Sequence, residues 1–328
     1  MTTYGDAKHY YGSEPTQYVN CYNPPNTTQT WPVFIMLPAA GFSSSAGQGD
    51  GLNPEALIMD NYGAVFVVNY RGVNYTTATP VRAAFPMELD DVVAGCLWVI
   101  NNAGTFYGDA SVLHIIGGSA GGTLAMLATA RLEELGYRVA SCHSFSSNTD
   151  WFSTVQYYVD ELSNSDATVV ASAVNHLGNI ANCYGVDSGA SNYQSNNLGT
   201  NGIYTLLWHY YWTNSSLVGS NPTTTLDPAT SFFGFGANYW DPTFFSEYSP
   251  AQRCSRYASR CRYQIFASLS DIEIPIEQAY VFLEALTDVG TAASVNPIAS
   301  VKHGWKLFDQ NDTFFAKTIS EFASASVN

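Results

Sequence analysis

One segment near the middle of the chain constrains its fold more than any other. Residues 112–116 form a short apolar run, residues 117–122 read GGSAGG, and residues 123–135 read TLAMLATARLEEL, which favours a helix. A strand that turns at once into a helix through small residues is the repeating unit of sheets with helical crossovers. The sequence therefore predicts an α/β fold with this unit near its centre.

Similar units on both sides extend the pattern. Short runs rich in β-branched residues are typical of strands buried on both faces. The longer segments between them carry apolar residues at three- and four-residue steps, as in helices that pack on a sheet. We expect a mostly parallel central sheet with right-handed crossovers and helices on both faces. The expected strands are residues 31–37, 64–69, 112–116, 137–145, 263–268 and 298–301, and the expected helices are residues 52–63, 86–102, 121–135, 276–286 and 312–323.

The alternation of strand and helix breaks between residues 151 and 240. This stretch is dense in Tyr, Trp, Asn, Ser and Gly, and it contains no defensible strand followed by a helix. We interpret it as a cap or lid inserted over the edge of the sheet. The expected organisation is a core made of residues 1–150 and 241–328, with the insertion at residues 151–240.

The charge balance excludes two classes of partner. Lys and Arg number 12 against 27 Asp and Glu, which gives a formal net charge of −15. Such a field repels phosphate backbones and anionic lipid, so we expect neither a nucleic acid nor a membrane surface as partner. No stretch approaches the roughly 20 apolar residues of a membrane span, and the start lacks the charge and apolar pattern of an export signal. We expect a soluble chain and predict no particular compartment or oligomeric state.

The six cysteines do not indicate a metal site. None of them belongs to a CxxC pair or to a Cys/His cluster with zinc spacing. Cys96 and Cys142 lie in apolar segments, which favours buried thiols. Cys254 and Cys261 flank a short polar loop and fit either a local disulfide or two free thiols.

Ser119 is the candidate nucleophile. Residues 117–121 fit the pattern G-x-S-x-G, in which a serine stands on a tight turn from strand to helix with its hydroxyl exposed. The pattern alone is weak evidence in a chain rich in Gly and Ser, but here an apolar strand precedes it and a helix follows it. Glycines suit such a turn because a Cβ would collide with the neighbouring strand and helix.

His303 is the candidate general base. A serine hydroxyl is a poor nucleophile at neutral pH unless a base takes its proton. Among the histidines, only His303 follows the last expected strand, at the sheet edge where α/β proteins bind ligands. The others lie in expected buried strands, near the terminus or in the insertion: His114, His143, His9, His176 and His209.

Asp271 is the candidate partner of this histidine. The orienting acid should fall between nucleophile and base in chain order, after a strand, and Asp271 follows the strand expected at residues 263–268. Glu273 stands two residues further on and points elsewhere if the loop is extended. Asp150, just past the strand that ends near residue 145, is the other candidate.

The backbone donors for an oxyanion are expected in two places. One is the amide of Ala120, directly after the nucleophile. The others are the amides of Ala40 and Gly41, in the loop PAAGF after the first buried strand, for which an ordinary turn of small residues is the alternative. Arg71 and Asp91 either pair to brace the active-site loops or form a solvated pair that contributes little.

Together these motifs resemble the hormone-sensitive-lipase-like and feruloyl-esterase-like branch of the α/β-hydrolases. The resemblance covers roughly residues 1–150 and 241–328. It implies an α/β-hydrolase fold, a serine carboxylesterase with the triad Ser119, His303 and Asp271, and no cofactor. The matching motifs are QYVNCYNP at 17–24, VVNYRG at 67–72, FPMELDDV at 85–92, GGSAGG at 117–122, SDIEIP at 270–275 and KHGW at 302–305.

This chain departs from the pattern of that family at two places. The family usually carries His-Gly-Gly-Gly where this chain reads PAAG at residues 38–41. The insertion at residues 151–240 is longer than the family implies and has no recognisable family sequence. Substrate choice should reside in that insertion, so the family's substrates transfer poorly.

The expected substrate is a small or polymer-linked carboxylic ester. Aromatic residues of the insertion fit an acyl or aryl pocket, a surface that stacks on sugar rings, or simply the core of a lid. Short-chain, aryl, and feruloylated or acetylated polysaccharide esters are therefore the candidates. Two alternatives stay open: an amidase, formamidase or peptidase that uses the same triad, and a catalytically silent binding protein on a hydrolase scaffold. The residues expected to contact substrate are Phe42, Gly118, Trp212 and Trp305.

Overall fold

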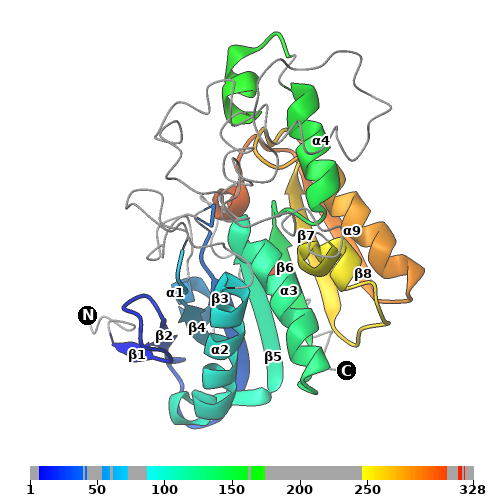
Figure 1. Ribbon diagram of the computed structural model, residues 1–328. Helices are drawn as coiled ribbons and strands as arrows, with labels where there is room; N and C mark the ends of the chain where they lie inside the picture. The colour runs from blue at the N-terminus through cyan, green and yellow to red at the C-terminus, as the bar shows by residue number, and fades with distance from the viewer. Residues whose placement is uncertain are drawn as a thin grey trace.

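A central eight-stranded sheet organises the molecule (Figure 1). The computed structural model describes residues 7–39, 41–42, 54–59, 62–72, 87–161, 164–173, 246–308, 317–319 and 321. The strand order is β1-β2-β4-β3-β5-β6-β7-β8. The strands are β1 Lys8–Tyr10, β2 Tyr18–Tyr22, β3 Trp31–Leu37, β4 Ala64–Val68, β5 Gly108–Gly118, β6 Ser141–Phe145, β7 Arg262–Ser268 and β8 Ala293–Ile298.

In the described part of the chain, β4, β3, β5, β6, β7 and β8 run parallel to one another. β1 pairs antiparallel with β2, and β2 pairs antiparallel with β4. The carboxyl ends of parallel strands lie at one edge of a sheet, where α/β proteins place their ligand sites. Gly118 at the end of β5 is in register with Phe145 at the end of β6, which is in register with Phe266 of β7. The loops after these strands therefore begin close together.

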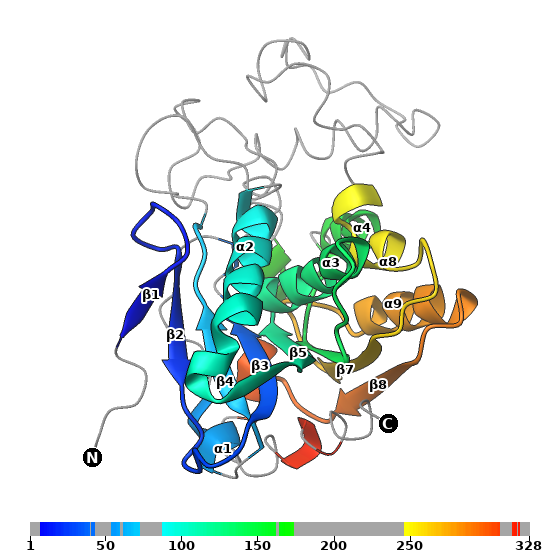
Figure 2. The ribbon, with the colours of Figure 1, turned by 90° about the horizontal axis from the view of Figure 1, so that it is seen from below.

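Helices cover both faces of the sheet. Figure 2 shows α2, α3 and α9 on one side and α1 on the other. The long crossover helix α2 turns an apolar stripe toward the strands, whereas α3 is buried along residues 120–130 on all sides. The helices are α1 Pro54–Met59, α2 Met87–Asn102, α3 Ala120–Glu134, α4 Trp151–Glu161, α8 Pro250–Arg253 and α9 Glu277–Asp288, with 3-10 turns η1 Ala103–Phe106 and η3 Gly304–Phe308.

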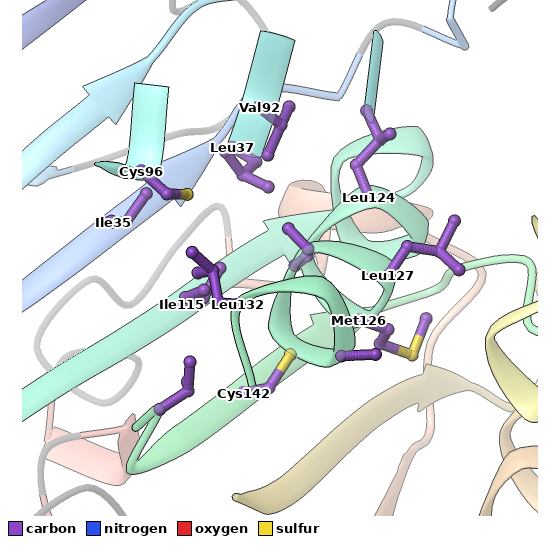
Figure 3. Packing of buried hydrophobic residues seen from close by; sticks show 14 of the residues in the cluster. Ile35, Leu37, Val92, Cys96, Ile115, Leu124, Met126, Leu127, Leu132 and Cys142 are labelled. Atoms are coloured by element: carbon purple, nitrogen blue, oxygen red, sulfur yellow. The ribbon is translucent and has the colours of Figure 1, made fainter. Parts of the chain in front are cut away.

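The larger hydrophobic core lies between the sheet and the helices α2 and α3 (Figure 3). Ile35 and Ile115 of the strands and Val92 and Leu124 of the helices are all fully buried. Burial of each such side chain contributes about 1.5–3 kcal/mol. This core fixes the junction of β5 and α3, where the candidate nucleophile lies.

The opposite face of the sheet carries a buried row of polar side chains. His114 Nδ1 lies 2.7 Å from Ser141 Oγ, and Ser141 Oγ lies 2.8 Å from His143 Nε2. His143 Nδ1 lies 2.9 Å from Gln264 Oε1, so the row crosses β5, β6 and β7. Because the Gln264 oxygen only accepts, His143 donates from Nδ1 and accepts from the serine hydroxyl, which in turn accepts from His114. Burial favours the neutral form of both histidines, and in that form the row gives each of them one defined tautomer.

The predicted elements agree with the structure in the centre of the sheet and differ at its edges. Residues 31–37 form β3 as expected, and β5 and α3 form the predicted strand–turn–helix unit. The last strand was wrongly placed at residues 298–301, whereas β8 is Ala293–Ile298. This edge strand pairs on one side only and contains Asn296 and Pro297, so it carries no continuous apolar run.

The region predicted to be a cap begins with helices and its two ends are tied together. The structure describes α4 and a further helical stretch at residues 167–173, while residues 174–245 lie outside the described residues. The Trp151 indole donates to Tyr248 O at 2.7 Å, and its backbone N–H donates to Ser249 Oγ at 3.1 Å. Ala251 N–H donates to Thr149 O at 2.8 Å. The chain thus enters and leaves this region at the same point.

Candidate active site

Ser119 stands at the sharp turn between β5 and α3. Its backbone has φ 53° and ψ −125°, a conformation that L-residues rarely adopt and that costs about 1–3 kcal/mol. The Ser119 N–H donates to Phe145 O at 2.8 Å, and α3 begins at the next residue. The neighbouring strand thus holds the serine in a strained position at the sheet edge, which is the geometry of a nucleophile elbow.

The glycines around Ser119 are required by close packing. A Cβ at Gly117 would collide with the backbone of Gly121, and a Cβ at Gly121 would collide with the carbonyl of Pro38. A Cβ at Gly122 would collide with the Ser147 hydroxyl. The turn can therefore close only without side chains at these positions, as the sequence pattern predicts.

His303 lies between β8 and η3 and faces the serine. Its Nε2 atom is 2.8 Å from Ser119 Oγ, and its Nδ1 atom is 2.8 Å from Asp271 Oδ2. Gly304 follows with φ 55°, a backbone conformation that favours glycine, and it lies against Ser119. The structure thus brings together Ser119, Asp271 and His303, the three residues that the sequence predicts to act together.

Asp271 is positioned by the turn that it starts. Its Oδ1 atom accepts from the backbone N–H groups of Glu273 at 2.8 Å and Ile274 at 3.2 Å, which leaves Oδ2 for His303. The other candidate acid, Asp150, lies at the start of α4, where its N–H donates to Gln278 Oε1 at 2.9 Å. The Nδ1 partner of the histidine is therefore Asp271.

The same turn brings Glu273 into the site. An extended loop would point this side chain away from the histidine, but the loop folds back on Asp271 and is not extended. Glu273 Oε2 lies 3.4 Å from His303 Nε2. Sequence reasoning missed this second carboxylate; the signal for it was the Asp-x-Glu spacing, since an Asp side chain often bonds to the backbone two residues on.

The environment of His303 favours its protonated form. Burial by itself lowers the pKa of the imidazole, but the hydrogen bond and charge of Asp271 and the charge of Glu273 outweigh it. Lys306 acts in the opposite direction. The net result is a His303 pKa raised above its usual value of 6.5, which suits a base that must hold a proton during a reaction.

Two of the three expected oxyanion donors, Ala120 and Gly41, are among the described residues. Ala120 is the first residue of α3, so its N–H has no partner within the helix. Gly41 and Phe42 have φ of 55° and 62°, so the loop after β3 turns sharply beside the nucleophile. Ala40 lies outside the described residues.

Tyr70 holds the base of this loop. Its hydroxyl lies 2.8 Å from Pro38 O and 3.2 Å from Ala39 O, and the side chain is buried. The next residue, Arg71, donates to both oxygens of the buried Asp91 through Nη2 at 2.6 Å and Nε at 2.8 Å. Of the two expectations for this ion pair, the bracing one agrees with the structure.

The residues expected to contact substrate have different surroundings. Phe42 is buried and packs on Trp151, with ring centroids 5.8 Å apart. Trp305 is only 2% exposed and stacks on Phe145 at 5.1 Å. It lies under Gly118, at which a Cβ would approach the indole to 2.7 Å. Phe42 and Trp305 thus pack in the core around the serine, and Trp212 lies outside the described residues.

The described residues offer no metal site. They contain no group of three or more His, Cys, Asp or Glu side chains that is arranged to hold an ion. Five cysteines are free, buried thiols, and Cys254 and Cys261 are among them, so these two form no disulfide. In the described ranges, none of the helices has the length and apolar character needed to cross a membrane.

Comparisons with known proteins agree with this geometry. The BD-FAE family model matches residues 19–192. Esterase B from Lactobacillus rhamnosis superposes with a TM-score of 0.62 at 13% identity, covering 98% of this chain and 86% of that chain. A fungal esterase from Rhizomucor miehei gives a TM-score of 0.57 at 16% identity, over 95% of this chain and 81% of that one. These likenesses confirm the expected α/β-hydrolase fold.

One curated relative shares a shorter region. Juvenile hormone esterase from Heliothis virescens is 36% identical over 110 residues. The match includes 31% of this chain and 18% of the relative, so the chain spans less than a fifth of that protein's length. The similarity supports the same superfamily and does not carry over the relative's substrate.

Proposed function

This chain belongs to the BD-FAE family, and from that premise we propose that it is a serine hydrolase that cleaves carboxylic esters through an acyl-enzyme. One observation carries the proposal: a continuous chain of hydrogen bonds runs from Ser119 Oγ through His303 to Asp271. The serine also stands in the strained elbow conformation. Structural packing alone gives no reason for a strained serine to face a histidine.

The first half-reaction uses both nitrogens of the His303 ring. Ser119 Oγ attacks the ester carbonyl while its proton passes to His303 Nε2 across 2.8 Å. Asp271 accepts from Nδ1–H, which keeps the proton off Nε2 beforehand and stabilises the imidazolium formed. The imidazolium then gives the proton to the leaving alcohol, and the acyl group remains on Ser119.

The developing oxyanion is stabilised by backbone amides. Ala120 supplies one N–H at the start of α3, where the helix dipole also favours negative charge. We assign the other donors to Ala40 and Gly41 of the neighbouring loop. Water activated by His303 then releases the acid and regenerates the serine.

The candidate substrates are short-chain, aryl, and feruloyl or acetyl esters, free or linked to a polysaccharide. We expect the acyl pocket to determine the order in which the enzyme prefers these substrates. If the triad hydrolyses amides instead, anilides should be turned over at rates comparable with the matching esters. If the chain is a catalytically silent binding protein, neither should be turned over.

The test is hydrolysis of p-nitrophenyl esters from acetyl to long acyl chains, beside the matching anilides. Native protein and Ser119→Ala are compared, and a fluorophosphonate label is located by mass. We expect ester turnover by the native chain, a loss of about 10⁴-fold or more in the variant, and labelling at Ser119. Labelling elsewhere, or equal turnover by the variant, would contradict the proposal.

A further inference from the structure

A second carboxylate lies at the reacting side of the candidate triad. Glu273 Oε2 is 3.4 Å from His303 Nε2, the same nitrogen that faces Ser119 Oγ. Asp271 occupies the other nitrogen, Nδ1. A triad that follows the mechanism above requires only Asp271, so the place of Glu273 needs another explanation.

The backbone under Glu273 is firmly held. Asp271 Oδ1 accepts from the Glu273 N–H at 2.8 Å, and the buried Tyr158 of α4 donates its hydroxyl to the Glu273 carbonyl. Ser172 of the following helical stretch lies 3.1 Å from Ile272 O. The start of the inserted region therefore fixes the turn from which this carboxylate projects.

The position of Glu273 relates it to one part of the substrate. In the proposed reaction His303 Nε2 gives its proton to the oxygen of the leaving alcohol, so the two atoms must come within about 3 Å. The Glu273 carboxylate then lies within about 6 Å of that oxygen. It flanks the alcohol portion of the ester, while the acyl carbon is bonded to Ser119.

We propose that Glu273 makes the enzyme select esters by the charge of their alcohol, favouring cationic alcohols and disfavouring anionic ones. The inference rests on the ester hydrolysis proposed above. Few cations oppose this effect, since the chain carries 12 Lys and Arg against 27 Asp and Glu. Lys306 of η3 is a cation near the histidine, but its side chain is exposed, so water screens its charge.

Solvent limits the size of the effect. The Glu273 side chain is 45% exposed, so water screens its charge. At about 6 Å and an effective dielectric constant between that of a protein surface and that of water, one charge changes a rate constant about 3- to 10-fold. The selection is therefore a graded preference.

Three acetate esters of similar size test the proposal. They are the ester of choline, its neutral isostere 3,3-dimethylbutyl acetate, and the acetate of a hydroxyalkyl sulfonate. We measure kcat/KM for each at low and high salt, with native protein, Glu273→Gln and Glu284→Gln. Glu284 is an exposed residue of α9, so its variant loses the same charge away from the site.

The expected result is a change in ratios. In Glu273→Gln the choline-to-neutral ratio should fall about 3- to 10-fold and the sulfonate-to-neutral ratio should rise by a similar factor. Both changes should shrink at high salt, and Glu284→Gln should keep the native ratios. A general effect of Glu273 on the basicity of His303 would change all three esters equally and would leave the ratios alone.

Two failures are distinguishable. If native protein hydrolyses the neutral ester but Glu273→Gln keeps both ratios within twofold, the charge selection is wrong and the ester hydrolysis stands. If native protein hydrolyses none of the three and takes up no fluorophosphonate, the proposed function is wrong and this inference is wrong with it.

Discussion

At the scale of single residues, the site depends on which atom of each side chain is used. Asp271 divides its two oxygens between its own turn and His303. That division fixes the tautomer in which Nδ1 carries the proton and Nε2 is free to accept one from Ser119. Because the His303 pKa is raised above its usual value of 6.5, this tautomer is lost at a higher pH than for an ordinary histidine, so kcat/KM should decline on the acidic side.

Replacement of Asp271 by Asn tests the tautomer argument. The amide can donate to Nδ1, which would place the proton on Nε2, where it blocks the serine. We expect kcat to fall about 10³- to 10⁴-fold in ester assays, by analogy with the known serine-protease case. The Asn retains an oxygen for the turn, so the urea midpoint should change little. A loss below tenfold would contradict the role of Asp271.

Tyr70 provides a second test at this scale. Loss of its hydroxyl in Tyr70→Phe leaves Pro38 O and Ala39 O without that donor, so the oxyanion loop should be less well placed. We expect kcat to fall about tenfold with a smaller change in KM. Tyr257→Phe is the matched control, because that hydroxyl also donates to a carbonyl, Ala130 O at 2.9 Å, outside the triad. Equal effects of the two variants would rule out a role in positioning.

At the scale of secondary-structure elements, the buried row across β5, β6 and β7 makes the sheet sensitive to acid. Burial lowers the pKa of His114 to about 3 and of His143 to about 4. The unfolded chain binds these protons near pH 6.5, and the folded chain binds them only at much lower pH. The neutral row therefore contributes its full stability above pH 6.5, and this stability is lost progressively as pH falls toward 4.

Urea unfolding against pH measures this loss. One histidine with such a shift costs about 2 kcal/mol of unfolding free energy at about pH 5. In His114→Asn the amide nitrogen can replace Nδ1 as donor to Ser141, and the titrating group is gone. We expect a shallower decline between pH 6.5 and 4 than in native protein. Parallel curves for the two proteins would show that His114 does not titrate on unfolding.

The sequence predicted the elements best where burial is continuous. The strand β3 and the second half of β5 are buried on both faces and α3 is largely buried, so mainly apolar and small residues mark them. The edge strands β1 and β8 pair on one side only and carry mixed polarity, so β1 was not predicted and β8 was misplaced. Their positions depend on pairing with β2 and β7, and the residues of the edge strands themselves do not encode that pairing.

The same reasoning applies to the site. The order of residues 119, 271 and 303 in the chain, and the position of each just after an expected strand, were enough to identify them as candidates. The topology puts the carboxyl ends of those strands side by side. The packing of Trp305 under the elbow and the approach of Glu273 were not predicted. Both depend on the path of a loop after its strand, and that path is set by hydrogen bonds to a single side chain or by contact with another element.

At the scale of the whole molecule, Asp91 joins three distant parts of the chain. Its carboxylate accepts from Gln17 Nε2 at 2.7 Å and from the Arg71 guanidinium, and Asp91 itself belongs to α2. These links connect the segment before β2, the loop after β4 and a core helix. Through Tyr70, which precedes Arg71, the same group supports the loop beside the nucleophile.

Asp91→Asn should therefore affect stability and activity together. The change removes the charge that the partly exposed Arg71 faces, while the Asp91 side chain is only 3% exposed. We expect a loss of about 2 kcal/mol in unfolding free energy and a several-fold lower kcat. Asp288→Asn, at an exposed site on α9, is the control and should change neither. A stable variant with native kcat would show that the ion pair is dispensable.

The hydrogen bonds between Thr149–Trp151 and Tyr248–Ala251 have a consequence for how this protein can change. They hold residues 149–151 against residues 248–251, so the two ends of the segment between them lie side by side. The entropy of closing a loop grows only slowly with length, about 0.6 kcal/mol for each doubling. Segments of quite different length can therefore be grafted in place of residues 174–245, which leaves Tyr158 and Ser172 to hold the turn after Asp271, and the triad, whose residues all lie outside the graft, keeps its framework.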